Sequence, residues 1–134
     1  MRPWFTESLG GFRRQSPAQI AASLAYKNAD RFAALEVKQR DSWEQSAALL
    51  QDALAGGDDA WHIFMECDLL RLEKRADVIL LTDRAIFVLE FKMGTQKPDL
   101  ADLRQTDNYA MDLHDFHAGS RGVPIIPVLI APSL

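Results

Sequence analysis

The fold of this chain is decided by residues 75–92, which read RADVILLTDRAIFVLEFK. Two apolar runs, Ala76–Leu81 and Ala85–Lys92, flank the polar pair Asp83-Arg84. Runs rich in β-branched and aromatic residues on either side of a short polar turn predict an antiparallel hairpin. If Thr82 pairs with Ala85, the register sets Asp77 directly opposite Glu90, whereas a turn of odd length would break that alignment.

Three charged residues interrupt these apolar strands: Asp77, Glu90 and Lys92. Opposed residues of an antiparallel pair have β-carbons about 4.5–5.5 Å apart, and like charges so placed are destabilising unless they are compensated. A divalent cation compensates them, and two carboxylates with the main-chain carbonyl of Phe91 suit Mg²⁺ or Mn²⁺. Lys92 should share the face of Glu90 and could position a metal-bound water. The competing interpretation is an ordinary ion pair on a solvated strand face.

The remaining pattern predicts an α/β domain. Helices are expected from Ser16-Pro17 to about Tyr26, from Asp41-Ser42 to Gly56-Gly57, and over Asp99–His117; further strands are expected at Trp61–Glu66 and Pro124–Ile130. This order gives an αβββαβ core with a central mixed four-stranded sheet flanked by helices and an extra N-terminal helix. Residues 1–38 are expected to form a helical N-terminal extension and residues 39–134 the core of one domain.

Composition limits the functions that this domain can have. The chain has 134 residues, 48% hydrophobic and 25% charged, which is typical of a globular domain. Its net charge of −4 disfavours a broad phosphate-binding surface, so contact with nucleic acid should be local. A single cysteine and the lack of a long apolar run in the sequence predict a cytoplasmic protein without internal disulfides.

Asp77 followed by Glu90-Phe91-Lys92, in this order of elements, resembles the PD-(D/E)XK nuclease superfamily. Gln105 and Tyr109 resemble the Q-x-x-x-Y motif of its RecB-like members. The resemblance implies a restriction-endonuclease-like fold and metal-dependent cleavage of DNA, with RNA as the less favoured substrate. It also implies that Gln105 and Tyr109 lie near the substrate. Ala76 departs from the superfamily pattern, which often has proline there.

A narrower resemblance extends from Gln39 to His117. This region is similar to the nuclease-like N-terminal part of bacterial proteins that continue into a superfamily 1 helicase or ATPase domain. The resemblance implies that the chain is the front piece of a longer protein and works with a fused or associated helicase. The chain has no G-x-x-x-x-G-K-[ST] motif, so no ATP motor is assigned to it.

Other charged residues are candidates for supporting roles. Glu66 ends a predicted strand and is either a further metal ligand or a surface glutamate. Lys74 and Arg75 precede Asp77 and could hold phosphates, or belong to a solvated loop. Glu44 is interpreted as a first-turn residue favoured by the helix dipole.

Two features have plainer interpretations. His114 and His117 are three residues apart, but two ligands without a third are weak evidence for zinc, and a solvated or helix-capping pair is favoured. Trp43 and Trp61 each open an apolar pattern and are expected to be core aromatics rather than base-stacking platforms.

Two functional alternatives to a nuclease are left open by the sequence. The first is a catalytically silent nucleic-acid-binding or interaction module that keeps the fold as a helicase accessory. The acidic net charge leaves room for it, although two opposed carboxylates would then lack an electrostatic purpose. The second, a small-molecule hydrolase or zinc protein, lacks a supporting constellation.

Overall fold

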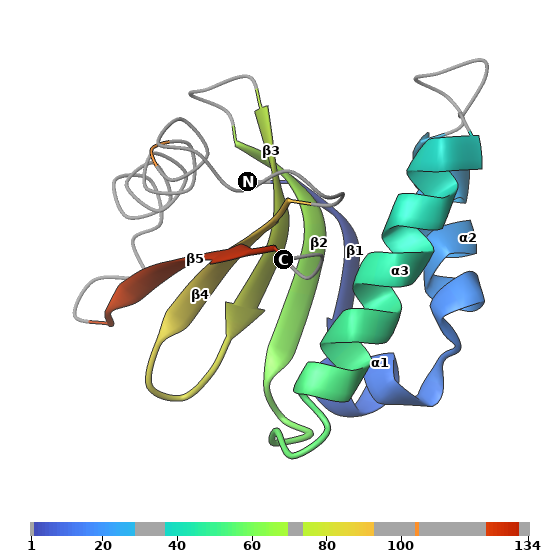
Figure 1. The fold of residues 1–134 in the computed structure, drawn as a ribbon. Helices are drawn as coiled ribbons and strands as arrows, with labels where there is room; N and C mark the ends of the chain where they lie inside the picture. The colour runs from blue at the N-terminus through green and yellow to red at the C-terminus, as the bar shows by residue number, and fades with distance from the viewer. Residues whose placement is uncertain (1, 29–36, 70–73, 93–103, 105–122, 132–134) are drawn as a thin grey trace.

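The protein is an α/β domain in which helices cover one face of a mixed sheet, as seen in a computed structural model (Figure 1). The structure describes residues 2–28, 37–69, 74–92, 104 and 123–131. Five strands follow one another in sequence order across the sheet. The pairings are antiparallel from the first strand to the fourth, and the fourth pairs parallel with the fifth.

The described elements are β1 Arg2–Ser8, α1 Leu9–Arg14, α2 Pro17–Asn28, α3 Val37–Ala53, β2 His62–Leu69, β3 Lys74–Leu81, β4 Ile86–Phe91 and β5 Ile125–Ile130. The predicted strands and the first two predicted helices are therefore all present, with shifted ends. The third predicted helix, Asp99–His117, lies outside the described residues except for Arg104.

The hairpin β3–β4 has the predicted register. The Thr82 main-chain N donates to the Ala85 carbonyl at 3.0 Å, and Leu81 pairs with Ile86. The Thr82 side chain also closes the turn, because its hydroxyl oxygen accepts hydrogen bonds from the main-chain N of Arg84 and Ala85 at 3.2 and 3.0 Å. Neither Asp83 nor Arg84 has a positive φ, so this turn forms without the glycine that tight hairpins often carry.

The prediction of a helical extension over residues 1–38 was wrong in part. Arg2–Ser8 forms an additional edge strand that pairs with β2. The sheet consequently has five strands instead of four. Trp4 and Phe5 are adjacent and both are buried, so the segment lacks the alternation that marks a half-buried strand. Pro3 fits an edge position because it cannot donate a ladder hydrogen bond.

Helix α3 begins at Val37, one turn before the predicted start at Asp41. No glycine or proline separates these positions, so nothing in the sequence stops the helix from extending. Glu44 consequently lies inside the helix and is exposed, and its interpretation as a first-turn residue was wrong.

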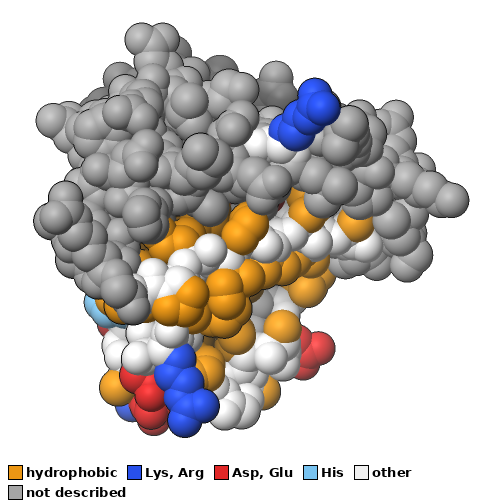
Figure 2. Space-filling view, turned by 90° about the vertical axis from the view of Figure 1, so that its left-hand side faces the viewer, with side chains coloured by type: hydrophobic (Ala, Val, Ile, Leu, Met, Phe, Trp, Pro, Cys, Tyr) orange, Lys and Arg blue, Asp and Glu red, His pale blue; other side chains and the backbone are white. Residues whose placement is uncertain are grey.

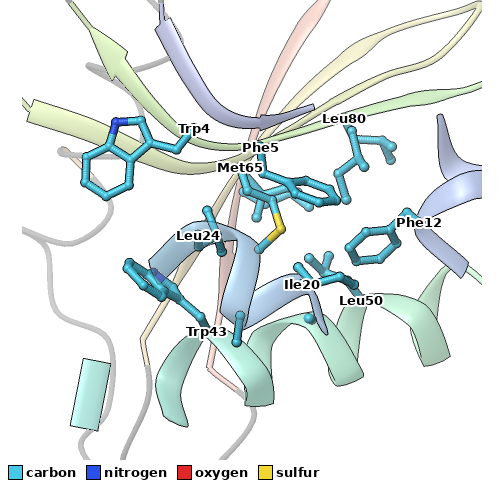
Figure 3. Close-up of a cluster of buried hydrophobic side chains, with 14 of the residues drawn as sticks. Trp4, Phe5, Phe12, Ile20, Leu24, Trp43, Leu50, Met65 and Leu80 are labelled. Atoms are coloured by element: carbon cyan, nitrogen blue, oxygen red, sulfur yellow. The ribbon is translucent and has the colours of Figure 1, made fainter. Parts of the chain in front are cut away.

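The main core lies between the sheet and helices α2 and α3 (Figure 3). Ile20 and Leu24 of α2 are fully buried there, and Met65 of β2 is almost fully buried. The rings of Trp4 and Trp43 meet edge to face with centroids 6.4 Å apart. Trp43 is therefore a core residue, as predicted, and α3 is fixed to the first strand.

The β5 side of the sheet is less deeply buried than the core under α2 and α3. Hydrophobic side chains form a band across the face seen in Figure 2, which looks onto the β5 side of the sheet. Ile126 of β5 is 39% exposed. Among the described strands β5 is an edge, and Pro127 within it is compatible with that position.

The C-terminal end of α3 is closed by one arginine. Arg13 Nη1 donates hydrogen bonds to the carbonyls of Leu54, Ala55 and Gly57 at 3.0, 2.9 and 3.0 Å. Its other terminal nitrogen pairs with Asp59. The Leu54 carbonyl also accepts a hydrogen bond from the Gly57 main-chain N at 3.0 Å. Arg13 adds a cationic donor to all three carbonyls just after the helix and opposes the negative end of the helix dipole.

We expect Arg13→Ala to lower the free energy of unfolding by about 1.5–3 kcal/mol, because three carbonyls lose a charged donor. Urea denaturation measures the change. Arg14→Ala, which changes an exposed arginine of the same helix, is the matched control, and Asp59→Asn should cost under about 1 kcal/mol because that partner is exposed. Equal losses from Arg13→Ala and Arg14→Ala would contradict the capping role.

Candidate functional site

Strands β3 and β4 stop pairing regularly where the two predicted carboxylates face each other. The last regular pair towards this end is Val78 with Leu89, and the next opposed pair is Asp77 with Glu90. Glu90 Oε1 accepts a hydrogen bond from the main-chain N of Asp77 at 3.0 Å, and Asp77 Oδ2 accepts one from the main-chain N of Phe91 at 2.9 Å. Each carboxylate thus binds the opposite strand, which fixes the two acids side by side.

The alternation of faces is interrupted beside this pair. Met65 and Val78 pack in the cluster under the helices, whereas Cys67 and Ala76 pack in a second cluster with Ile79 and its neighbours. Strict alternation would put Met65 and Cys67 on one face. Glu66, between them, has φ 51°, a left-handed backbone that glutamate rarely adopts. This irregular residue lies across the sheet from Asp77, between the pairs Met65–Val78 and Cys67–Ala76.

Glu90 is held in an environment that favours its neutral form. Its side chain is buried, with the residue 9% exposed. Burial, and secondarily the negative charge of Asp77, raise the pKa of the Glu90 carboxyl from 4.5 to about 9, although the hydrogen bond from the Asp77 main-chain N opposes the rise. A smaller contribution in the same direction comes from Glu66. Three acids therefore share one electrostatic environment.

A cavity of about 200 Å³ opens between α3 and this end of the sheet. Its lining comes from Ser42, Trp43 and Ser46 of α3, Met65 and Glu66 of β2, Asp77 and Val78 of β3, and Phe91 of β4. Asp77 and Glu66 are thus brought together at a cavity with mixed polar and apolar walls, whereas Glu90 is not among the residues that line it. Because Asp77 is opposed to Glu90, strict alternation would place Asp77 and Phe91 on opposite faces, but both residues border this cavity.

Two side chains of α3 contribute polar groups to the cavity. Trp43 Nε1 donates a hydrogen bond to Glu66 Oε1 at 3.0 Å. Ser46 is 7% exposed, and in the described part of the chain its hydroxyl makes no hydrogen bond. The sequence did not single out Ser42 and Ser46 as candidates; the available signal was their i, i+4 spacing beside the apolar stripe of the helix.

The other predicted site residues are only partly tested by the described residues. Lys92 is partly buried, and its main-chain N donates to the Ile130 carbonyl at 2.7 Å, which ties the end of β4 to β5. Lys74 and Arg75 lie at the start of β3 on the same strand as Asp77. Gln105, Tyr109, His114 and His117 lie outside the described residues.

Within the described ranges, no group of three or more His, Cys, Asp and Glu side chains is arranged to hold a metal ion. None of the described helices is long and apolar enough to cross a membrane. Comparison with known proteins adds no assignment, since no family model, curated protein or solved structure matches the chain.

The raised pKa of Glu90 predicts a specific pH dependence of stability. Between pH 4.5 and 9 the unfolded chain releases this proton while the folded chain keeps it, so stability should fall as pH rises through that range. Glu90→Gln keeps an oxygen for the Asp77 main-chain N and removes the ionisation. The free energy of unfolding of the variant should therefore rise relative to that of the wild type as pH increases, by at most about 1.4 kcal/mol per pH unit.

Thermal or urea unfolding of both proteins at intervals from pH 5 to 9, without added metal, measures this difference. A difference in stability that stays constant across the range would show that Glu90 ionises normally. Asp83→Asn, which alters an exposed acid in the hairpin turn, controls for the removal of one negative charge.

Proposed function

We propose that this chain is a divalent-metal-dependent nuclease domain of the PD-(D/E)XK type that hydrolyses phosphodiester bonds in DNA, with RNA as the less favoured substrate. The observation that carries the proposal is the pairing of Asp77 and Glu90 at the point where β3 and β4 stop pairing regularly, with Asp77 lining a cavity. Adjacent carboxylates of this kind have an unfavourable interaction that a cation would relieve.

The donor set fits Mg²⁺ or Mn²⁺. Mg²⁺ is commonly held by one or two carboxylates, with waters and substrate phosphates completing its octahedral shell, so a closed cage of three protein side chains is unnecessary. Asp77, Glu90 and the Phe91 carbonyl would hold the ion, and Glu66 is a candidate further ligand because it borders the cavity with Asp77. The raised pKa of Glu90 supports a site in which negative charge lacks compensation.

The bound ion and the residues of the site would have distinct tasks in hydrolysis. The bound ion supplies Lewis-acid stabilisation of a phosphate and lowers the pKa of a coordinated water. Lys92, two residues after Glu90, would hold the attacking water or offset negative charge on the phosphate. The hydrogen bond from its main-chain N to Ile130 supports this role because it restrains the backbone from which the side chain extends.

Nucleic acid would be oriented by residues on either side of this pair. Arg75 and Lys74 are proposed phosphate contacts because they precede Asp77 on β3. Gln105 and Tyr109 are proposed substrate contacts through the resemblance to the Q-x-x-x-Y motif. The same resemblance underlies the proposal of a fused or associated helicase or ATPase as partner.

Cleavage of labelled single- and double-stranded DNA with Mg²⁺, Mn²⁺ or EDTA tests the proposal. We expect metal-dependent cutting that falls at least roughly 100-fold in Lys92→Ala, because a group acting on the attacking water is lost. Asp77→Asn should fall at least as far, since it keeps an oxygen for the Phe91 main-chain N but loses the charge that holds the cation. Labelled RNA of the same sequence tests the substrate preference.

Arg84→Ala and Asp83→Asn are the matched controls, because both change an exposed charge in the turn of the same hairpin. They should cut like the wild type. Absence of metal-dependent cutting by the wild type, with the chain folded, would reject the nuclease and favour the silent nucleic-acid-binding module; retained cutting in Lys92→Ala would reject the assigned role of that lysine.

A further inference from the structure

We propose that Trp43 is a positioning residue of the cation site: its indole N–H holds the Glu66 carboxylate at the cavity, where Glu66 acts with Asp77 on the bound ion. The inference rests on the metal site of the proposed function and deepens it, because it assigns a task to a core residue. Three independent features of the described residues support it.

The first feature is the backbone of Glu66. A φ of 51° is unfavourable for a side chain with a β-carbon, and glycine or asparagine usually takes such a position. Strand β2 nevertheless pairs regularly with β1 and β3 on both sides of this residue. Unusual backbone held by regular surroundings is characteristic of functional sites. Here it lets Glu66 border the helix-side cavity together with its neighbour Met65.

The second feature is the rigid mounting of the donor. Trp43 is 4% exposed, and its ring packs edge to face with that of Trp4. Figure 3 shows Trp43 reaching from α3 towards the sheet within the core cluster. Since the ring is confined by packing, the 3.0 Å hydrogen bond from Nε1 to Glu66 Oε1 restricts where that carboxylate can lie.

The third feature is Ser46, which lines the same cavity. Ser46 is more than nine-tenths buried, and among the described residues its hydroxyl has no hydrogen-bond partner. A buried hydroxyl without a partner is costly, so this group calls for water or a ligand within the cavity. A hydrated cation held by Glu66 and Asp77 would supply such water.

A purely structural explanation makes a different prediction. A buried indole N–H needs an acceptor, and Glu66 could serve only to satisfy it. In that case removal of the N–H would change stability and leave cation binding unaltered. Trp43→Phe removes the donor while keeping an aromatic ring, and Trp61→Phe makes the same chemical change at a partly buried tryptophan at the other end of β2.

Calorimetric titration of the full chain with Mn²⁺ alone, without nucleic acid, is the test. We expect Trp43→Phe to weaken Mn²⁺ binding roughly 10- to 100-fold, as loss of a partner that orients a metal ligand does, and Trp61→Phe to bind like the wild type. Glu66→Gln, which still accepts the indole hydrogen bond, should weaken binding at least as much. Near-ultraviolet circular dichroism verifies that each variant is folded.

Wild-type affinity in folded Trp43→Phe would overturn the inference, and so would wild-type affinity in Glu66→Gln. Failure of the wild type to bind Mn²⁺ would overturn both this inference and the metal site on which it rests. Mn²⁺ binding that responds to these variants, without cleavage of any nucleic acid, would refute the nuclease and leave the inference standing.

Discussion

The site depends on the placement of two acids, Asp77 and Glu90, opposite each other across β3 and β4. Their mutual repulsion is unfavourable in a partly buried setting. Without a metal ion, the raised pKa of Glu90 keeps its carboxyl protonated at neutral pH, which removes this repulsion. The hydrogen bonds to the main-chain N of Asp77 and Phe91 keep both groups in place.

The hydrophobic core provides the support. Trp43 packs against Trp4 on one side and reaches Glu66 on the other, so a single side chain links β1, α3 and the third acid. The extra strand β1 has a functional consequence for this reason: without it the tryptophan would lack its edge-to-face partner. The far end of α3 is fixed separately by Arg13, which leaves the cavity end to be set by aromatic packing.

The sequence predicted the parts of this arrangement that are local. The hairpin register followed from the short turn at Asp83-Arg84, and Thr82 enforces it with its own hydroxyl. Strand β1 was missed because its partner is some sixty residues away and its adjacent aromatics hide any alternation. The left-handed backbone of Glu66 and the buried Ser46 were missed because both result from packing between α3 and the sheet, which no local pattern encodes.

Unfavourable features are concentrated around Asp77, which lines the cavity. The left-handed glutamate, the serine hydroxyl without a partner among the described residues and the acid with the raised pKa all lie beside Asp77, whereas Ile20, Leu24 and Met65 show ordinary apolar burial. Each feature would be easy to remove: glycine would suit the backbone, alanine would replace the serine, and glutamine would end the repulsion. A sequence under selection for stability alone would remove them, so their coincidence around Asp77 is the physical argument for placing the proposed function at this end of the sheet.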